Sequence, residues 1–311
     1  MSASLDLDLD GVQRAIGATL EQFCSDRCSD AQVKAWWGQL PRDAWGDIAD
    51  LGVLALATPY GDGGPIELVA ALEALGRAVF PGPLAATFLA TQILPEPEGR
   101  AVALGESVVS VSSGPLRPWA PHADIFIELE GTHAWRGEPA GPIEPISTVG
   151  GEPWGRVALL RTTDLGDVSA ALALHDTALA AFTAAAGARL VADAALHART
   201  RVQFGRAIGE FQAVALPLAQ AQIQLDAAAA LARVAAWEID AACPTAAVRA
   251  AAARVSACRA GLLAAYTCHQ TFGAMGAMLE GPVFYISRRL RQLASQPPTL
   301  EGATDALWAS L

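Results

Sequence analysis

The order of hydrophobic periodicities constrains the fold of this chain more than any single motif does. Apolar residues recur at helical spacing over residues 9–104, with breaks at clusters of Gly and Pro, and one helix between two of these breaks is expected over residues 66–77. The spacing then alternates, as it does in half-buried strands, over residues 108–112, 124–130 and 156–160. Helical spacing returns beyond Asp167 and continues to the end of the chain. This order predicts a mainly α-helical protein with a small β-region in its middle.

We therefore expect three regions: an N-terminal helical domain over residues 1–104, a reduced β-domain over 105–166, and a C-terminal helical bundle over 167–311. The chain has 311 residues, which exceeds the usual size of a domain with one core. Alanine is abundant in the second half, and small side chains let helices approach closely. The third region is thus predicted to be an antiparallel bundle of about four helices.

Two apolar stripes in this bundle are predicted to face its core. They comprise Ile223, Ala227, Leu231 and Val234 on one helix, and Val248, Ala252, Val255, Leu262 and Tyr266 on the next. Pro217 is expected in the first turn of its helix, where a missing N–H is tolerated.

Composition argues against several classes of partner. The formal net charge is -11, with Lys34 as the one lysine, so nucleic acid and anionic membranes do not fit as partners. Five scattered cysteines offer no zinc ligand set and indicate reduced thiols, so we expect no metal and a cytoplasmic location. The acidic alternation of residues 5–8 is not typical of a secretion signal, and Arg and Asp interrupt the alanine-rich runs too often for a membrane span.

One segment between two helical runs indicates an anion site. The first run reaches Arg201, Gly205 can end it, and the second run opens at Gln212. Arg201 supplies a fork of donors for phosphate oxygens, Gln203 adds an amide, and Phe204 adds an apolar wall. Spacing alone favours an ordinary helix hairpin that carries a surface arginine.

Three segments, in the same order, resemble segments of one known family. Residues 201–212 are similar to the Arg-x-Gln-Phe-Gly…Phe-Gln segment of acyl-CoA dehydrogenases. Residues 270–283 are similar to the family's Gln-x-x-Gly-Gly-x-Gly…Glu-x-Pro segment, and residues 300–304 to its Tyr-Glu-Gly-Thr segment. The order of helices, small sheet and helices also resembles the three-domain layout of this family over nearly the whole chain.

The resemblance implies an FAD-dependent oxidation of an acyl-CoA to its trans-2-enoyl form, with electrons passed to an electron-transfer flavoprotein. In the family each flavin lies across a subunit interface, and the first two segments contact its adenine and diphosphate end. The cofactor-binding residues implied here are Arg201, Gln203, Phe204, Phe211, Gln212, Gln270, Gly273 and Ala274, the last in place of a family glycine.

By the same resemblance, Glu301 stands at the position of the catalytic base. Such a base takes the α-proton of the thioester, and apolar surroundings raise the pKa of its carboxyl, while the flavin takes the β-hydride. This chain departs from the family pattern there: Ala303 replaces a threonine, residues 295–298 lengthen the interval before the glutamate, and few residues follow it. Some relatives place the base on the first helix of the bundle, where the nearest carboxylate is Asp176, ranked second.

The β-region departs further from the family. It is about half the family's size, and it lacks the Thr-Glu-Pro-x-Ala-Gly-Ser-Asp loop and the Trp-Ile-Thr-Asn strand that bind the flavin ring. This combination resembles the short subunits of α2β2 enzymes that degrade steroid side chains, which implies a chain that completes the FAD site of a larger partner. Two alternatives stay open: a self-associated, self-sufficient dehydrogenase that uses Glu301, and a structural subunit that binds no cofactor.

Overall fold

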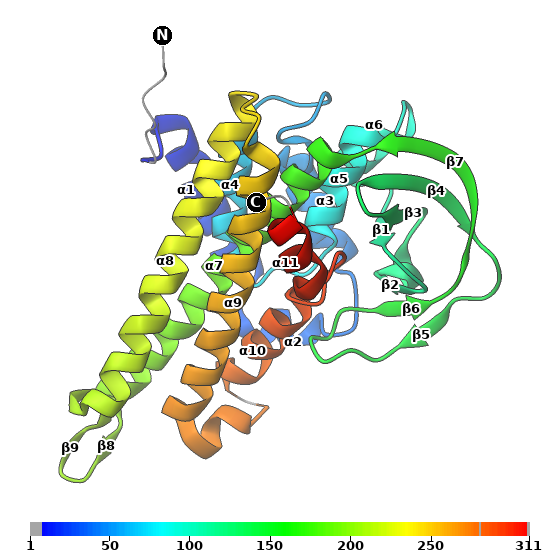
Figure 1. The fold of residues 1–311 in the computed structure, drawn as a ribbon. Coiled ribbons are helices and arrows are strands. Elements are labelled where there is room, and N and C mark those ends of the chain that lie inside the picture. Colours follow the sequence, from blue (N-terminus) through cyan, green and yellow to red (C-terminus); the bar gives the residue numbers. More distant parts are fainter. Residues whose placement is uncertain (1–7, 280, 310–311) are drawn as a thin grey trace.

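The computed structural model describes residues 8–279 and 281–309. The N-terminal part is helical, as predicted, and Figure 1 shows these helices packed against the bundle. Its elements are α1 (Gly11–Arg27), α2 (Asp30–Ala35), α3 (Arg42–Asp50), the 3-10 helix η1 (Val53–Ala55), α4 (Pro65–Arg77), α5 (Leu84–Ile93) and α6 (Glu98–Ala103).

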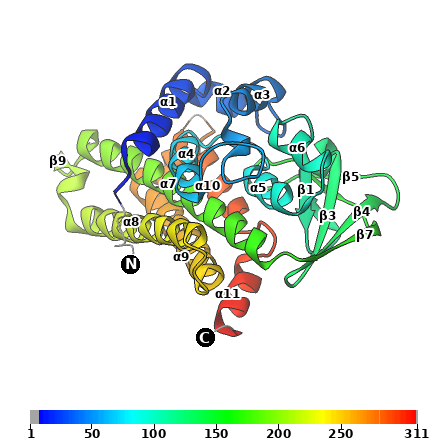
Figure 2. The same cartoon turned by 90° about the horizontal axis from the view of Figure 1, so that it is seen from above.

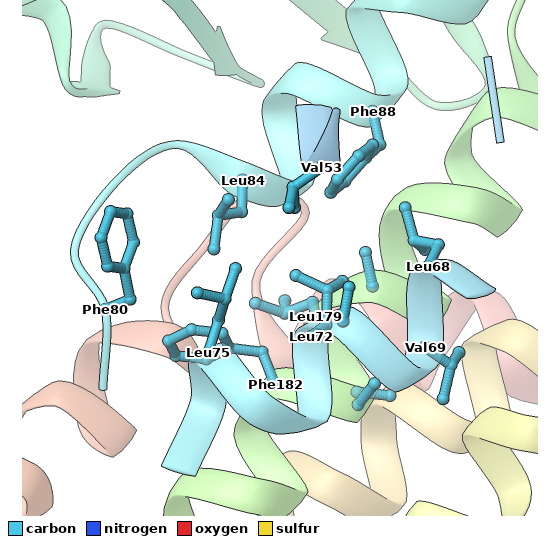
Figure 3. Close-up of a cluster of buried hydrophobic side chains, with 14 of the residues drawn as sticks. Val53, Leu68, Val69, Leu72, Leu75, Phe80, Leu84, Phe88, Leu179 and Phe182 are labelled. Atoms are coloured by element: carbon cyan, nitrogen blue, oxygen red, sulfur yellow. The ribbon is translucent and has the colours of Figure 1, made fainter. Parts of the chain in front are cut away.

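Helix α4 forms the centre of the N-terminal core. Pro65 occupies its first turn, and the side chain of Glu67 accepts a hydrogen bond from the Gly64 N–H at 2.8 Å, which together define where the helix starts. Figure 3 shows its apolar side chains directed toward α5 and toward Leu179 and Phe182. The helix is buried along almost its whole length, so it links the N-terminal helices to the bundle.

The middle of the chain forms two small sheets. The larger has the order β1-β3-β4-β7, with β1 and β3 parallel and the other neighbours antiparallel; the smaller has the order β2-β6-β5. The strands are β1 (Val109–Ser112), β2 (Leu116–Pro118), β3 (Ile125–Glu130), β4 (His133–Pro139), β5 (Glu144–Ile146), β6 (Trp154–Arg156) and β7 (Leu159–Asp167), and the 3-10 helix η2 (Ala120–His122) lies between β2 and β3.

The single strand predicted over residues 156–160 is wrong. Residue 156 ends β6, residue 159 begins β7, and the two strands belong to different sheets. The N–H of Val157 donates to the Pro115 carbonyl, and the carbonyl of Ala158 accepts from the Ala140 N–H, both at 2.9 Å. These contacts with distant segments carry the chain from one sheet to the other, and local alternation does not encode them.

The C-terminal part is the predicted helical bundle. Its helices are α7 (Ser169–Thr200), α8 (Gln212–Asp240), α9 (Ala246–Phe272), α10 (Pro282–Leu293) and α11 (Leu300–Ala309), with the short strands β8 (Val202–Gln203) and β9 (Arg206–Ala207) and the 3-10 helices η3 (Ile208–Glu210) and η4 (Gly273–Ala277). Helix α7 contacts α4, α5, α8, α9 and α10. It is long and apolar enough to cross a membrane by those criteria alone, but 67% of its most apolar window is buried, so it is the core helix of this fold.

The stripe predicted on α8 is only partly right: Leu231 and Val234 are half-buried, and Leu231 packs against the core, but Ile223 and Ala227 are exposed. Ile223 is 68% exposed, whereas the buried residues of α8 are mainly small, and Pro217 lies in the second turn rather than the first. The buried face comprises Leu218, Ala221, Leu225, Ala228, Ala232, Ala235 and Ala236, with Glu238. Small side chains let α8 approach α7 and α9, so the alanine face is the one that packs.

On α9 the prediction holds for Val255, which is buried, but Tyr266 is 63% exposed.

The sheets and the β8–β9 hairpin lie at opposite ends of the molecule. Both views agree on this placement: the hairpin projects from the far end of α7 and α8, and the strands of the sheets lie beyond α5 and α6 (Figures 1 and 2). The mainly α-helical class with a small β-region is therefore confirmed.

Candidate functional site

The hairpin at the far end of the bundle carries the first candidate site. Helix α7 ends at Thr200, and the chain reverses through Phe204 (φ 55°) and Gly205 (φ 82°), both in the left-handed region. The short strands β8 and β9 pair on either side of this turn. The break predicted at Gly205 and the new helix at Gln212 are both present.

A ring contact brings the two candidate segments to the same end of the bundle. His197, on the last turn of α7, stacks on Phe272 at the end of α9, with ring centroids 4.3 Å apart and an interplanar angle of 14°. Arg201 follows one turn after the histidine, and Gln270 precedes the phenylalanine by two residues. Burial, and then the charge of Arg201, lower the pKa of His197.

The side chains predicted to bind the cofactor are mostly exposed at this end. Exposed residues are Arg201, Gln203, Phe204, Gln212, Gln270, Gly273 and Ala274, while Phe211 is half-buried. Phe204 is 92% exposed, and the Arg206 guanidinium lies 4.1 Å from the Phe211 ring centroid. Over residues 8–279 and 281–309, the Arg201 guanidinium forms no ion pair.

This donor set suits an anionic ligand. A guanidinium and two amides, beside the exposed ring of Phe204 and the half-buried ring of Phe211, match the diphosphate and the flat base of a dinucleotide. The fit is partial as it stands, because Gln203 Nε2 donates to the neighbouring Val202 carbonyl at 2.7 Å. Glu280, which belongs to the second family-like segment, lies outside the described residues.

A second candidate site lies between the small sheets and the bundle. An inner cavity of about 30 Å³ is lined from α7 by His175, Leu179 and Phe182, and from elsewhere by residues that include Trp119 and Gln296. This volume holds one or two water molecules. The inner cavity is therefore too narrow, in this conformation, for an acyl chain or a flavin ring.

Two buried ion pairs flank the inner cavity. Arg289 donates to Glu152, a residue that is 3% exposed and also accepts from Trp154 Nε1 at 3.1 Å. Arg254, which is fully buried, donates to Asp176 Oδ1 at 2.7 Å. Each carboxylate is thus already paired with a guanidinium.

The histidine beside Asp176 is the polar group that sequence reasoning missed. His175 Nδ1 lies 2.9 Å from Asp176 Oδ1, and its Nε2 has no hydrogen bond within the described part of the chain. Burial lowers the pKa of His175, which favours the neutral ring. Burial acts to raise the pKa of Asp176, but the charge of Arg254 and the hydrogen bonds from His175 and Arg254 together outweigh it and hold that pKa below its usual value. The adjacent His and Asp were visible in the sequence, but only the structure shows which of them lines the cavity.

Glu301 lies apart from both sites. It stands in the first turn of α11, is exposed, and is absent from the described residues that line the inner cavity. The linker of residues 295–299, between α10 and α11, contributes Gln296 and Pro297 to the cavity wall instead. Ala303, which stands where the family has a threonine, is buried.

Known proteins share this architecture. The family model of the acyl-CoA dehydrogenase C-terminal domain matches residues 167–308. The ChsE4-ChsE5 complex from Mycobacterium tuberculosis aligns with a TM-score of 0.82 at 24% identity, covering 98% of this chain and 97% of that chain. The three-part fold, with its helical bundle, is that of the acyl-CoA dehydrogenases.

Two curated relatives from Mycobacterium tuberculosis (strain ATCC 25618 / H37Rv) agree. Acyl-CoA dehydrogenase FadE34 is 32% identical over 284 residues, and acyl-CoA dehydrogenase FadE27 is 29% identical over 330 residues. The alignments cover 79% and 86% of this chain; the chain spans 39% of the length of FadE34 and 86% of that of FadE27. The chain belongs to the acyl-CoA dehydrogenase family, as its sequence motifs indicated.

Proposed function

We propose that this chain is a subunit of an FAD-dependent acyl-CoA dehydrogenase and that it completes the FAD site of a larger partner subunit. The observation that carries the proposal is the exposed donor set around Arg201 and Gln270, at the end of the molecule opposite the sheets. Exposed donors on a projecting hairpin are available to a ligand held on another chain, and the chain's own inner cavity lies elsewhere.

Each residue of the donor set has a distinct task in this proposal. Arg201 neutralises the diphosphate and fixes it with directed N–H donors, and Gln203 and Gln270 add amide hydrogen bonds. Phe204 and Phe211 provide apolar surface for the adenine. Gly273 has a φ of 59°, and a Cβ added there would meet nothing within 4 Å, so the backbone is open to close approach. FAD, when bound, supplies the acceptor for the hydrogen that leaves Cβ of the acyl group.

The other half of a flavin site is poorly developed in this chain. The inner cavity of about 30 Å³ has no room for a flavin ring, and the two carboxylates beside it are paired with Arg254 and Arg289. Glu301 is exposed, whereas a base for the α-proton works best in apolar surroundings. These observations favour chemistry on the partner rather than on this chain.

The remaining parts of the proposal follow from the same assignment. The substrate is an acyl-CoA thioester, and the bulky side chain of a steroid is the particular acyl group we propose. The assembly is α2β2, the electrons pass to an electron-transfer flavoprotein, and the location is the cytoplasm. The ChsE4-ChsE5 structure, which is a complex of two named proteins, supports the two-chain assembly.

The test is to co-purify the chain with a larger homologue and to measure FAD by its visible absorbance. We expect one FAD per pair of unlike chains. Arg201→Ala should weaken FAD binding about tenfold or more, because a charge-assisted hydrogen bond contributes about 1.5–3 kcal/mol. Arg259→Ala, which removes an exposed arginine of α9, is the matched control and should leave FAD binding unchanged.

Glu301→Gln separates the alternatives. The proposed subunit keeps both its FAD and the turnover of the complex in this variant. A self-sufficient enzyme keeps FAD but loses turnover, and it holds one FAD in every chain. A purely structural subunit leaves FAD unchanged in Arg201→Ala as well.

A further inference from the structure

The linker of residues 295–299 occupies the edge of the inner cavity. It joins α10 to α11, and two of its residues, Gln296 and Pro297, line the cavity together with Leu293 at the end of α10. The opposite wall is α7, through His175, Leu179 and Phe182. The linker therefore lies where a ligand entering between α7 and the sheets would have to pass.

Arg254, a fully buried arginine of α9, anchors this linker to the bundle. Arg254 Nη2 donates to the Gln296 carbonyl at 2.6 Å and to the Pro298 carbonyl, while its Nη1 donates to Asp176. One guanidinium thus ties two carbonyls of the linker to a carboxylate on α7. Displacing the linker would leave the Nη2 donor of this buried guanidinium without an acceptor, which is unfavourable.

A second anchor ties the linker to the β-region. Gln296 Nε2 donates to Glu152, which also accepts from Arg289 of α10. The Leu300 N–H, just beyond the linker, donates to the Ala294 carbonyl at 3.1 Å. The linker is held from the bundle, from α10 and from the sheet side at once.

We propose that the linker of residues 295–299 blocks the inner cavity and so excludes acyl chains from it. The acyl-CoA site of the complex then lies on the partner subunit, and the assembly binds at most one acyl-CoA per pair of unlike chains. The inference rests on the proposed role of the chain as a subunit. It adds that the side chains of Gln296 and Pro297 keep an acyl chain out of this chain's own inner cavity.

The experiment counts bound octanoyl-CoA by equilibrium dialysis on the co-purified complex, without an electron acceptor. The wild-type complex should bind no more than one octanoyl-CoA per pair. The double variant Gln296→Ala/Pro297→Ala removes the linker side chains that line the cavity and should bind one more. Two molecules per pair in the wild type, or no gain in the variant, would overturn the proposal.

Two further variants complete the test, one as a fallback and one as a control. Gln296→Ala alone retains both prolines and should give the same gain, at weaker affinity, if the double variant fails to fold. Ser295→Ala is the matched control on the same linker: its exposed hydroxyl donates to the Arg291 carbonyl at 3.1 Å and does not line the inner cavity, so the count should not change. The FAD content of the same samples is a separate readout: one FAD in every chain refutes the subunit role, whatever the octanoyl-CoA count.

Discussion

The ion pair with Arg254 limits the chemical roles that the Asp176 carboxylate can take. The sequence ranked it as the second choice for a base, after Glu301. Arg254, 78 residues away along the chain, pairs with it in the buried core and keeps its pKa low. An ionised carboxylate held in that way is a poor proton acceptor, so the role left to it is to orient the ring of His175.

At the same scale, His175 should give the protein a distinct pH dependence of stability. Its pKa in the folded chain is lowered from an ordinary value of about 6.5, so the unfolded chain takes up a proton first as the pH falls. The stability that it contributes is complete above about pH 6.5 and is lost as the pH falls toward the lowered folded pKa. His175→Gln should flatten this part of the profile in urea denaturation between about pH 7.5 and 5. His133→Gln, at an exposed histidine, is the control, and an equally steep profile in His175→Gln would contradict the assignment.

At the scale of elements, the contact between α4 and α7 shows how closely helices pack here. A Cβ at Gly76 of α4 would lie 2.5 Å from the Phe182 carbonyl oxygen and 3.0 Å from the Ala185 Cβ. The oxygen belongs to the backbone and cannot rotate away. The glycine is therefore needed for the close approach of the two helices, not for an unusual φ.

Gly76→Ala should consequently destabilise the protein by about 1–3 kcal/mol, because one methyl group overpacks the interface. Gly17→Ala, in the middle of α1, has nothing within 4 Å of the added Cβ. It should stabilise the protein by about 0.5–1 kcal/mol through its helix propensity. Urea denaturation of the two variants measures the contrast. Equal effects of the two substitutions would show that α4 and α7 are further apart than described.

At the scale of the whole molecule, the two candidate sites are separated by the length of the bundle. The hairpin next to Arg201 projects at one end of the bundle (Figure 1). The inner cavity is lined by β1, β2 and the first half of α7, toward the other end. One chain with this shape can present its donor set only to a ligand outside its own cavity. The arrangement supports a flavin site shared between chains.

Hydrogen exchange should measure how far the β8–β9 hairpin is protected when the complex assembles. In the chain alone, the amides of residues 202–207 should exchange quickly, because the short β8–β9 hairpin is exposed, and those in the buried centre of α7 should exchange most slowly. Assembly with the partner and FAD should slow exchange in the hairpin. The turn at residues 131–132 between β3 and β4, at the other end, should not change. An unprotected hairpin in the complex would argue against a cofactor site there.

The sequence by itself determined the order of a helical region, a β-region and a second helical region, the bounds of α4, the chain reversal at Gly205 and the membership of the family. All of these depend on local information: hydrophobic periodicity, turn residues and short motifs. The same information predicted a helical bundle after residue 167, which the structure confirms.

The tertiary structure decided the features that depend on residues far apart in the chain. It selected the alanine face of α8 over the face of Ile223, and it divided residues 156–160 between two sheets. It also placed His175 rather than Asp176 on the inner cavity and added Gln296 and Pro297 to the wall of that cavity. The physical reason is the same in each case: close packing and buried ion pairs join distant segments, and no local pattern encodes which segments will meet.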